Sequence, residues 1–172
     1  KLKEATWLGR IAYDAGLKVG QKRAAYLKAL SRVPLYLKCT FFVFDNLVFR
    51  NIRRALGIDK CRWLSTAAAP IAPDLIDWYW SIGKPMYEVY GQTECTGIAT
   101  ANLLDDFRIG SVGKAIDDVE VVLSEEDEIL IRSPGVIKGY WNKAEKTAET
   151  IRQGWLHTGD VGRIDDDGFI YI

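Results

Sequence analysis

The chain has 172 residues, of which 48% are hydrophobic and 12% aromatic, so it suits one globular domain or a large part of one and not a disordered segment. Its 23 basic and 23 acidic side chains cancel, although residues 1–60 are strongly basic and the remainder is acidic. A single histidine and three widely spaced cysteines argue against a zinc site and against a secreted disulfide scaffold.

No apolar run is long enough to cross a bilayer, and no secretory signal pattern opens the sequence. We therefore expect a cytoplasmic protein and keep peripheral membrane association open. No nucleic-acid-binding motif accompanies the basic region, so we expect no nucleic-acid partner.

Helical spacing dominates the first third of the chain. Apolar residues recur every three to four positions over residues 2–30, where Gly16 and Gly20 are expected to separate two helices. An aromatic-rich helix is expected over residues 35–56, with Gly57 as its left-handed stop.

Residues 1–32 combine 8 basic side chains with interleaved aromatic ones. Lys18, Lys22 and Arg23 are the basic residues near the middle of this stretch that we expect to matter most. The pattern indicates contact with anionic lipid, or a basic helix face that is simply solvated, or a basic face that packs on another part of the protein.

A strand–helix–strand unit follows. A short strand is expected over residues 61–66, then the small residues 67–69, a helix that begins at Pro73, and a second strand over Met86–Tyr90. In such a crossover the strands are parallel and usually adjacent, so their carboxyl ends lie at one edge of the sheet. Small residues there let a flat ligand approach the backbone.

The turn after the second strand carries the chemistry. Gly91 ends the strand, and Thr93 and Glu94 follow at the edge where open α/β sheets bind ligands. A threonine hydroxyl can donate to a phosphoryl oxygen, and a glutamate carboxylate is a hard ligand for Mg²⁺. The alternative is a polar cap that satisfies only its own backbone. Cys95 is expected to be a packed thiol, because the adjacent carboxylate disfavours a thiolate nucleophile.

The pattern changes after residue 97 to short strands and turns. We therefore divide the chain into residues 1–97, a helical and α/β part, and residues 98–172, a β-rich part. The second part predicts a hairpin, a helix and a second hairpin, over residues 119–132, 142–151 and 161–172.

Asp160 is the second candidate binding residue. It follows two residues that suit a turn, and a carboxylate held on a turn can accept both hydroxyls of a ribose. An aspartate that only caps the turn before the last hairpin fits the sequence equally well.

Four segments in this order resemble signatures of the AMP-forming acyl-CoA synthetases. They are YGQTE at residues 90–94, EILIR with GYW within 128–141, GWLHTGD at 154–160 and DGFIYI at 167–172. The resemblance extends over about residues 62–172, and residues 47–57 resemble the long-chain fatty acyl branch in particular.

The resemblance implies an α/β fold, with βαβ units of a parallel sheet and a β-rich subdomain, inside an N-terminal adenylation domain. It implies that a fatty acid and ATP give an acyl-adenylate and pyrophosphate, and that the thiol of coenzyme A then attacks the adenylate. Mg²⁺ is the implied metal, because phosphoryl chemistry needs charge compensation more than it needs a side-chain nucleophile.

The resemblance also implies roles for single residues. Thr93 would bond phosphate and Glu94 would hold Mg²⁺, and these two are the implied catalytic residues. Tyr90 and Gly91 would line the adenine, and Asp160 would bind the ribose hydroxyls.

Ala68 and Ala69 stand where the family has a glycine-rich adenine wall. Backbone contacts survive that change, but the added methyl groups alter how closely the base can pack.

Two other family features, a phosphate loop and a lysine-bearing C-terminal domain, do not occur in these residues. We therefore expect an internal part of a longer enzyme, inactive by itself. The alternatives are another adenylating ligase, acting on an aryl or amino acid, or a catalytically silent lipid-binding or scaffold homologue. The sequence leaves the acyl chain length and the oligomeric state open.

Overall fold

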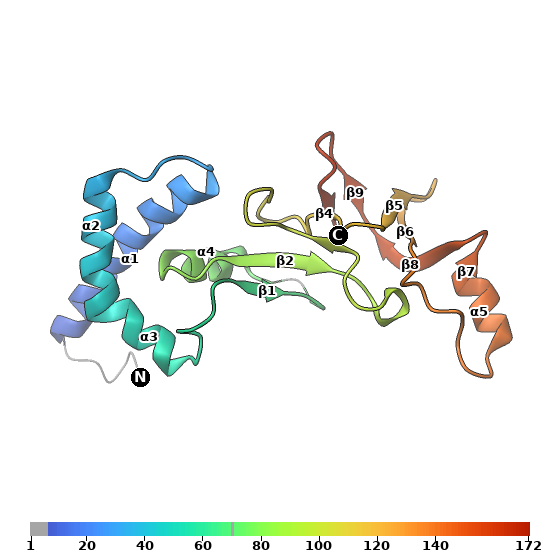
Figure 1. The fold of residues 1–172 in the computed structure, drawn as a ribbon, viewed down its shortest axis with the longest axis horizontal. Helices are drawn as coiled ribbons and strands as arrows, with labels where there is room; N and C mark the ends of the chain where they lie inside the picture. Colours follow the sequence, from blue (N-terminus) through green and yellow to red (C-terminus); the bar gives the residue numbers. More distant parts are fainter. Residues whose placement is uncertain (1–6, 70) are drawn as a thin grey trace. The chain divides into compact units, whose positions relative to one another are not determined.

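The computed structural model describes residues 7–69 and 71–172, which form two compact units (Figure 1). The first unit comprises residues up to Leu64 together with Ile71–Met86, and the second comprises Ser65–Pro70 together with Tyr87–Ile172. The division at residue 97 stays a prediction about subdomains.

The first unit begins with one uninterrupted helix, α1 (Trp7–Lys28), so the expected break at Gly16 and Gly20 is wrong. Both glycines are buried. A Cβ atom at Gly20 would overlap the backbone of Ser81, and one at Gly16 would lie 3.0 Å from the ring of Phe44. These glycines therefore serve close helix packing and not helix breaking.

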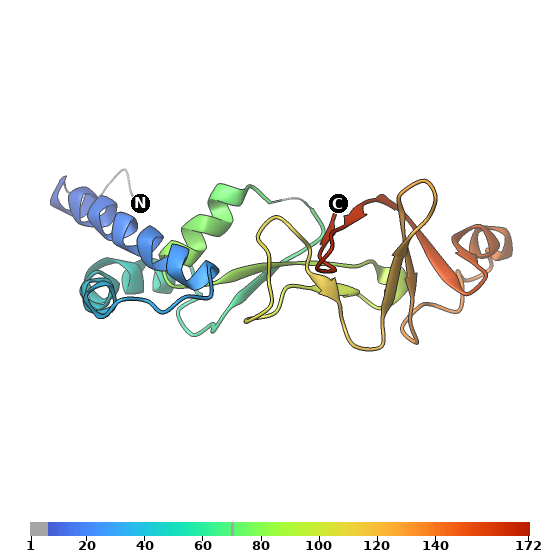
Figure 2. The ribbon, with the colours of Figure 1, turned by 90° about the horizontal axis from the view of Figure 1, so that it is seen from above.

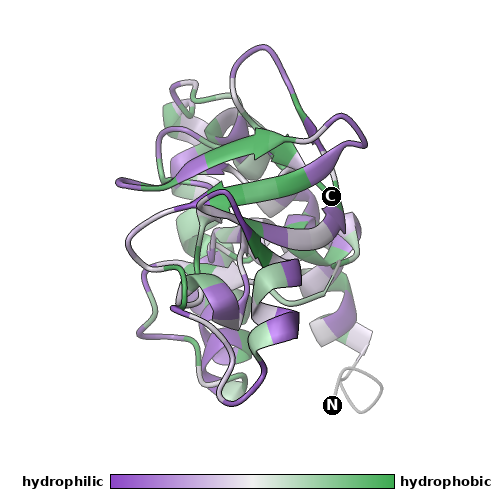
Figure 3. Cartoon of the chain, turned by 90° about the vertical axis from the view of Figure 1, so that its right-hand side faces the viewer, coloured by the Kyte–Doolittle hydropathy of each residue, from purple (hydrophilic) through white to green (hydrophobic). Residues whose placement is uncertain are grey.

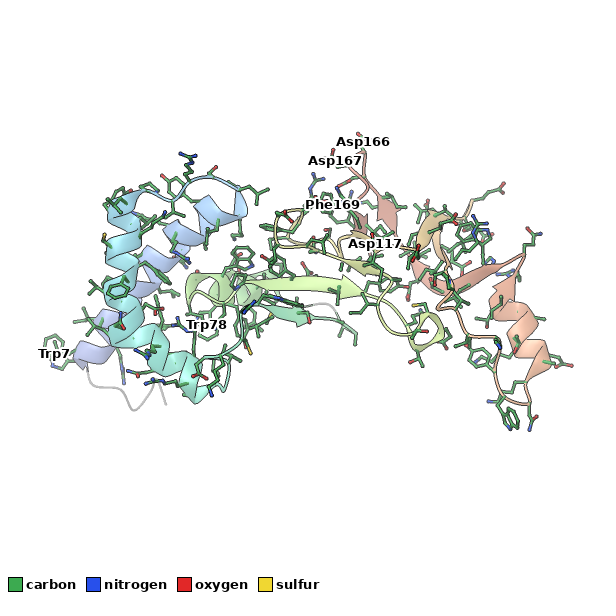
Figure 4. The ribbon with its side chains drawn as sticks, viewed as in Figure 1. Trp7, Trp78, Asp117, Asp166, Asp167 and Phe169 are labelled. Carbon is green, nitrogen blue, oxygen red and sulfur yellow. The ribbon has the colours of Figure 1, made fainter. Side chains whose placement is uncertain are left out.

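Helix α1 packs against α2 (Leu35–Phe44) and α4 (Pro73–Ser81), as Figure 2 shows. The indole Nε1 of Trp78 on α4 donates a hydrogen bond of 2.8 Å to the hydroxyl of Tyr13 on α1. Trp78 is labelled in Figure 4. Proline at the first position of α4 fits the helix start that the sequence predicts.

The aromatic-rich helix expected over residues 35–56 is confirmed, but its middle is a π-helical turn. That turn, Asp45–Phe49, joins α2 to α3 (Arg50–Ala55), and Gly57 ends the segment with a φ of +73°. The carboxylate of Asp45 makes a bidentate ion pair with Arg53, eight residues or about two turns further along. No residue pattern distinguished this wider turn from an ordinary α-helix.

The strand–helix–strand unit is confirmed as β1 (Leu64–Thr66), α4 and β2 (Met86–Tyr90), with β1 and β2 adjacent and parallel in Figure 1. Two short antiparallel strands, β3 (Thr100–Ala101) and β4 (Lys114–Ala115), extend the sheet in the order β1-β2-β3-β4.

A second sheet has the antiparallel order β5-β6-β8-β7, and a helix and a two-stranded hairpin accompany it. The elements are β5 (Glu120–Leu123), β6 (Glu128–Arg132), α5 (Ala144–Thr150), β7 (Ile151–Arg152), β8 (Trp155–Val161), β9 (Arg163–Ile164) and β10 (Ile170–Tyr171). Both predicted hairpins are confirmed. The core beside this sheet includes the fully buried side chains of Ile129, Ile131 and Leu156. Hydrophobic residues of these strands are green in Figure 3.

The expectation for Cys95 is confirmed, since the residue is 5% exposed and packs in this core. Burial among apolar side chains, next to Glu94, suits a structural cysteine.

The acidic turn of the last hairpin is held by one arginine. Arg108 pairs with Asp165 and with Asp167, and its guanidinium carbon lies 4.5 Å from the centroid of the Phe169 ring. Asp167 and Phe169 are labelled in Figure 4. Two of the three carboxylates in this turn are therefore paired with a basic side chain of the protein.

Among the helices of residues 7–69 and 71–172, none has the length and apolar content that crossing a membrane requires.

Candidate functional site

The turn after β2 is shaped by backbone contacts that only glycine permits. A Cβ atom at Gly91 would overlap the carbonyl oxygen of Gly97, because the chain folds back on itself here. The amide of Gly97 donates to the carbonyl of Gln92 over 3.0 Å, and that of Ala99 donates to the carbonyl of Tyr90 over 2.8 Å. The enclosed residues Thr93–Cys95 form a 3₁₀ turn at the strand end, where the sequence places them.

The structure brings Tyr90 and Asp160 together, as expected of two residues that belong to one site. The hydroxyl of Tyr90 donates to Oδ2 of Asp160 over 2.6 Å. Burial, followed by this hydrogen bond to a carboxylate, raises the pKa of Tyr90 above its ordinary value, so the phenol stays protonated and remains a donor at neutral pH.

Gln92 joins this pair and was missed by the sequence analysis. Its Nε2 donates to Oδ2 of Asp160 over 2.9 Å and to the carbonyl of Thr158 over 3.0 Å. The only signal in the sequence was its place inside the YGQTE segment, which does not reveal partners more than 60 residues away.

Asp160 lies on a strand, so its expected placement on a turn is wrong. It belongs to β8, whose pairing with β6 shifts register between Glu128 and Leu130. Gly159 has a φ of +76° at this irregularity, which explains why residues typical of turns occur here. The hydroxyl of Thr158 accepts from the amide of Asp160 over 3.1 Å and so fixes the backbone beside the carboxylate.

Glu128 on β6 contacts the same irregular stretch of β8 through hydrogen bonds. Its Oε1 accepts from the amide of Gly159 over 2.9 Å, and its Oε2 lies 2.8 Å from Nδ1 of His157. Burial would raise the pKa of Glu128, but the bonds from His157 and Gly159 outweigh it and hold the pKa below its ordinary value. The only histidine of the sequence thus has a structural partner.

Glu94 has a hydrogen-bond partner that the sequence analysis did not identify. The hydroxyl of Tyr140 donates to its Oε1 over 2.7 Å, and the amide of Ile137 donates to its backbone carbonyl over 2.8 Å. The bond to Glu94, aided by desolvation, raises the pKa of Tyr140. The GYW residues had entered the sequence analysis only as part of the resemblance.

The donor set at Glu94 fits a magnesium ion held together with a nucleotide. Within the described part of the chain no group of three or more acidic, histidine or cysteine side chains could bind a metal alone. Magnesium in nucleotide sites uses one or two carboxylates and takes its other ligands from phosphate and water. With Oε1 engaged by Tyr140, Glu94 has Oε2 for that role.

The remaining candidate residues take no part in these hydrogen bonds. Thr93 is exposed at the turn, with its hydroxyl unbonded among the described residues. Ala68 and Ala69 are exposed beyond β1, and Ala68 has a φ of +72°. An alanine therefore holds a left-handed backbone that glycine adopts without strain.

Comparison with known proteins identifies relatives of this chain. Residues 18–141, more than half of the chain, match the family described as AMP-binding enzyme. A long-chain-fatty-acid–CoA ligase of Xenopus laevis is 38% identical over 178 residues, covering 100% of this chain and 23% of that protein.

Solved structures agree with this match. The N-terminal domain of FACL13 from Mycobacterium tuberculosis has a TM-score of 0.60 and 30% identity, over 73% of this chain and 36% of the other. O-succinylbenzoate coenzyme A synthetase from Bacillus subtilis, solved with ATP and a magnesium ion, has a TM-score of 0.58 and 28% identity, over 64% of this chain and 26% of the other.

The chain spans about a quarter of the length of the Xenopus ligase. Its mixed α/β architecture and its neighbours confirm the expected fold, that of an N-terminal adenylation domain. The chain therefore belongs to the AMP-binding enzyme family, and its relatives within that family include fatty-acid–CoA ligases.

Proposed function

We propose that the protein to which this chain belongs is a long-chain fatty acid–CoA ligase that forms AMP. The observation that carries the proposal is a pair of carboxylates, Glu94 in the turn after β2 and Asp160 on β8, each hydrogen-bonded to a tyrosine hydroxyl. Asp160 is fixed by Tyr90, and Glu94, four residues after Tyr90, is fixed by Tyr140. This arrangement supports Asp160 as the contact for a ribose and Glu94 as the contact for a metal-bound phosphate.

The residues of this chain would act by binding and orientation. Asp160 accepts hydrogen bonds from the ribose hydroxyls, and Thr93 donates its free hydroxyl to a phosphoryl oxygen. Tyr90 and Gly91, with the backbone at Ala68 and Ala69, border the adenine. Such positioning supplies much of the catalysis in phosphoryl and nucleotidyl transfer, where the chemistry needs alignment and charge compensation.

Mg²⁺ at Glu94 would offset the negative charge of the triphosphate and of the departing pyrophosphate. The bond from Tyr140 holds one oxygen of Glu94, so the other is presented in a fixed direction. The fatty acid, ATP and coenzyme A are the proposed substrates, and the parts of the enzyme outside this chain complete the reaction.

A long-chain acid is supported by the name of the Xenopus relative and by the resemblance of residues 47–57 to that branch. We further propose a cytoplasmic location with reversible contact to anionic membranes through the basic part of α1, and no nucleic-acid partner.

Acid-dependent exchange of pyrophosphate into ATP tests the proposed function in the complete protein. Fatty acids of several lengths, an aryl acid and a set of amino acids should be compared. We expect exchange with long fatty acids, followed by thioester formation when coenzyme A is added. Exchange with only the aryl acid or an amino acid would indicate another adenylating ligase, and no exchange with any acid would indicate a catalytically silent homologue.

A further inference from the structure

Gln92 occupies a position between β2 and β8 at which both hydrogens of its side-chain amide are used. One is donated to the carbonyl of Thr158 over 3.0 Å and the other to Oδ2 of Asp160 over 2.9 Å. Both partners are oxygen acceptors, so turning the amide over would place its own oxygen against them. The orientation of Gln92 is therefore determined by its surroundings.

This arrangement uses the hydrogen-bond accepting capacity of one carboxylate oxygen of Asp160 and leaves the other oxygen free to accept. Oδ2 accepts from Gln92 and also from the hydroxyl of Tyr90, which lies 2.6 Å away. A carboxylate oxygen accepts about two strong hydrogen bonds, so Oδ2 has no capacity left. Within the described residues no side chain donates to Oδ1, and that oxygen remains for a ligand.

The bond to Thr158 gives the arrangement its rigidity. Thr158 is two residues before Asp160 on β8. Gln92 therefore donates hydrogen bonds both to the backbone of β8 and to the carboxylate of Asp160 on the same strand. A carboxylate held on two sides loses little rotational freedom when a ligand binds, and it cannot turn its filled oxygen toward the ligand.

We propose that Gln92 is a positioning residue for nucleotide recognition, which fixes Asp160 so that Oδ1 alone accepts the ribose hydroxyls. This inference rests on the proposed function, since it takes Asp160 to be the ribose contact. It makes Gln92 a determinant of the choice between ribose and deoxyribose nucleotides, because only a fixed acceptor distinguishes a hydroxyl from a hydrogen strongly.

The test is calorimetric titration of the complete protein with ATP, 2′-deoxy-ATP and 3′-deoxy-ATP. Gln92→Leu removes both donors at similar length, and Gln92→Glu keeps the shape but replaces the donors with a carboxylate. Gln21→Leu, at an exposed position of α1, is the matched control. Thermal melting identifies any variant that does not fold. The Gln92 variant that does fold then tests whether Gln92 affects nucleotide discrimination.

We expect each Gln92 variant to bind ATP about 10-fold more weakly and to lose much less affinity for the deoxy nucleotides. The difference in affinity between ATP and the deoxy nucleotides should therefore shrink. The KM for the fatty acid should not change, whereas a general loss of structure would alter it. Undiminished discrimination in a folded Gln92 variant would overturn the inference.

Asp160→Ala separates this inference from the function on which it rests. If Asp160→Ala abolishes the discrimination but Gln92→Leu and Gln92→Glu preserve it, the ribose contact is correct and the role of Gln92 is wrong. If Asp160→Ala leaves ATP affinity and discrimination intact, the assignment of Asp160 fails and the inference fails with it.

Discussion

The hydroxyl of Tyr140 donates to Oε1 of Glu94 over 2.7 Å, although 46 residues separate the two in the sequence. This bond leaves Oε2 as the oxygen that can reach a metal. Tyr140→Phe keeps the ring and removes the bond, so the carboxylate should become free to rotate. We expect the Mg²⁺ concentration needed for half-maximal adenylation to rise about 3- to 10-fold.

The measurement for Tyr140 is a magnesium titration of acid-dependent pyrophosphate exchange in the complete protein. Tyr36→Phe, at an exposed position on α2, is the control and should leave the titration unchanged. An identical magnesium dependence in Tyr140→Phe and the unmodified protein would show that this bond does not orient the metal ligand.

Ala68 provides a prediction about stability. Its φ of +72° costs an alanine about 1 kcal/mol relative to glycine. Ala68→Gly should therefore raise the free energy of unfolding by about 0.5–1 kcal/mol, despite the greater freedom of glycine in the unfolded chain. Ala69→Gly is the control, since Ala69 does not have a positive φ, and it should be neutral or destabilising. Denaturant titration checks both, and a loss of stability in Ala68→Gly would contradict the strain argument.

The lowered pKa of Glu128 predicts that the stability of the fold depends on pH. Although burial opposes it, bonds from His157 and Gly159 lower the pKa of Glu128 in the folded protein. A carboxylate whose folded pKa is lowered stabilises the fold above its ordinary pKa, near 4.3, and loses that contribution as the pH falls through the folded pKa. Glu128→Gln should therefore be less stable at neutral pH and should lose less stability on acidification.

Denaturant midpoints measured between neutral pH and about pH 3 test this expectation for Glu128. Glu125→Gln, in the exposed turn beside it, is the control and should follow the unmodified protein. Parallel stability curves for Glu128→Gln and the unmodified protein would mean that the bonds to His157 and Gly159 contribute nothing.

The basic part of α1 predicts binding to anionic vesicles, but not through all three residues that the sequence suggested. Lys18 and Lys22 are exposed, whereas Arg23 is half-buried with its guanidinium 4.3 Å from the ring centroid of Phe41. Burial lowers the pKa of Arg23, which marks it as part of the packing. We therefore expect membrane attraction from the two lysines only.

Vesicle sedimentation of the complete protein checks this. Replacing Lys18 and Lys22 with Gln should weaken binding to anionic vesicles by about 10- to 30-fold, at about 1 kcal/mol for each charge. Added salt should have a similar effect. Replacing Lys138 and Lys143, which are exposed in the second unit, is the control. Binding that ignores salt and both lysines would leave α1 without a role at membranes.

The sequence was sufficient for features that depend on near neighbours. The bounds of β2, the start of α4 at Pro73 and the stop at Gly57 follow from strand-forming residues, proline and glycine, whose effects are local. Hairpins β5–β6 and β9–β10 were predictable for the same reason.

The remainder depended on contacts between distant residues. Gly16 and Gly20 have the composition of a helix break, and only the backbone of Ser81 and the ring of Phe44 show that they serve packing. The strand at Asp160 looked like a turn because a register shift in a sheet needs the same flexible residues as a turn does.

Gln92 and Tyr140 were not predicted as site residues, because amides and phenols occur everywhere on protein surfaces. Their roles follow from partners 46 to 68 residues away, a separation at which no local pattern carries information.

The most direct test of the account is formation of the acyl-adenylate by the complete protein carrying Glu94→Gln. This change keeps an acceptor for the hydroxyl of Tyr140 and removes only the charge that would hold Mg²⁺, with Glu145→Gln on the exposed start of α5 as the control. We expect single-turnover adenylation to fall by at least ~100-fold in Glu94→Gln and to be unchanged in the control. Adenylation at the unmodified rate in Glu94→Gln would contradict the placement of the metal and phosphate at the turn after β2.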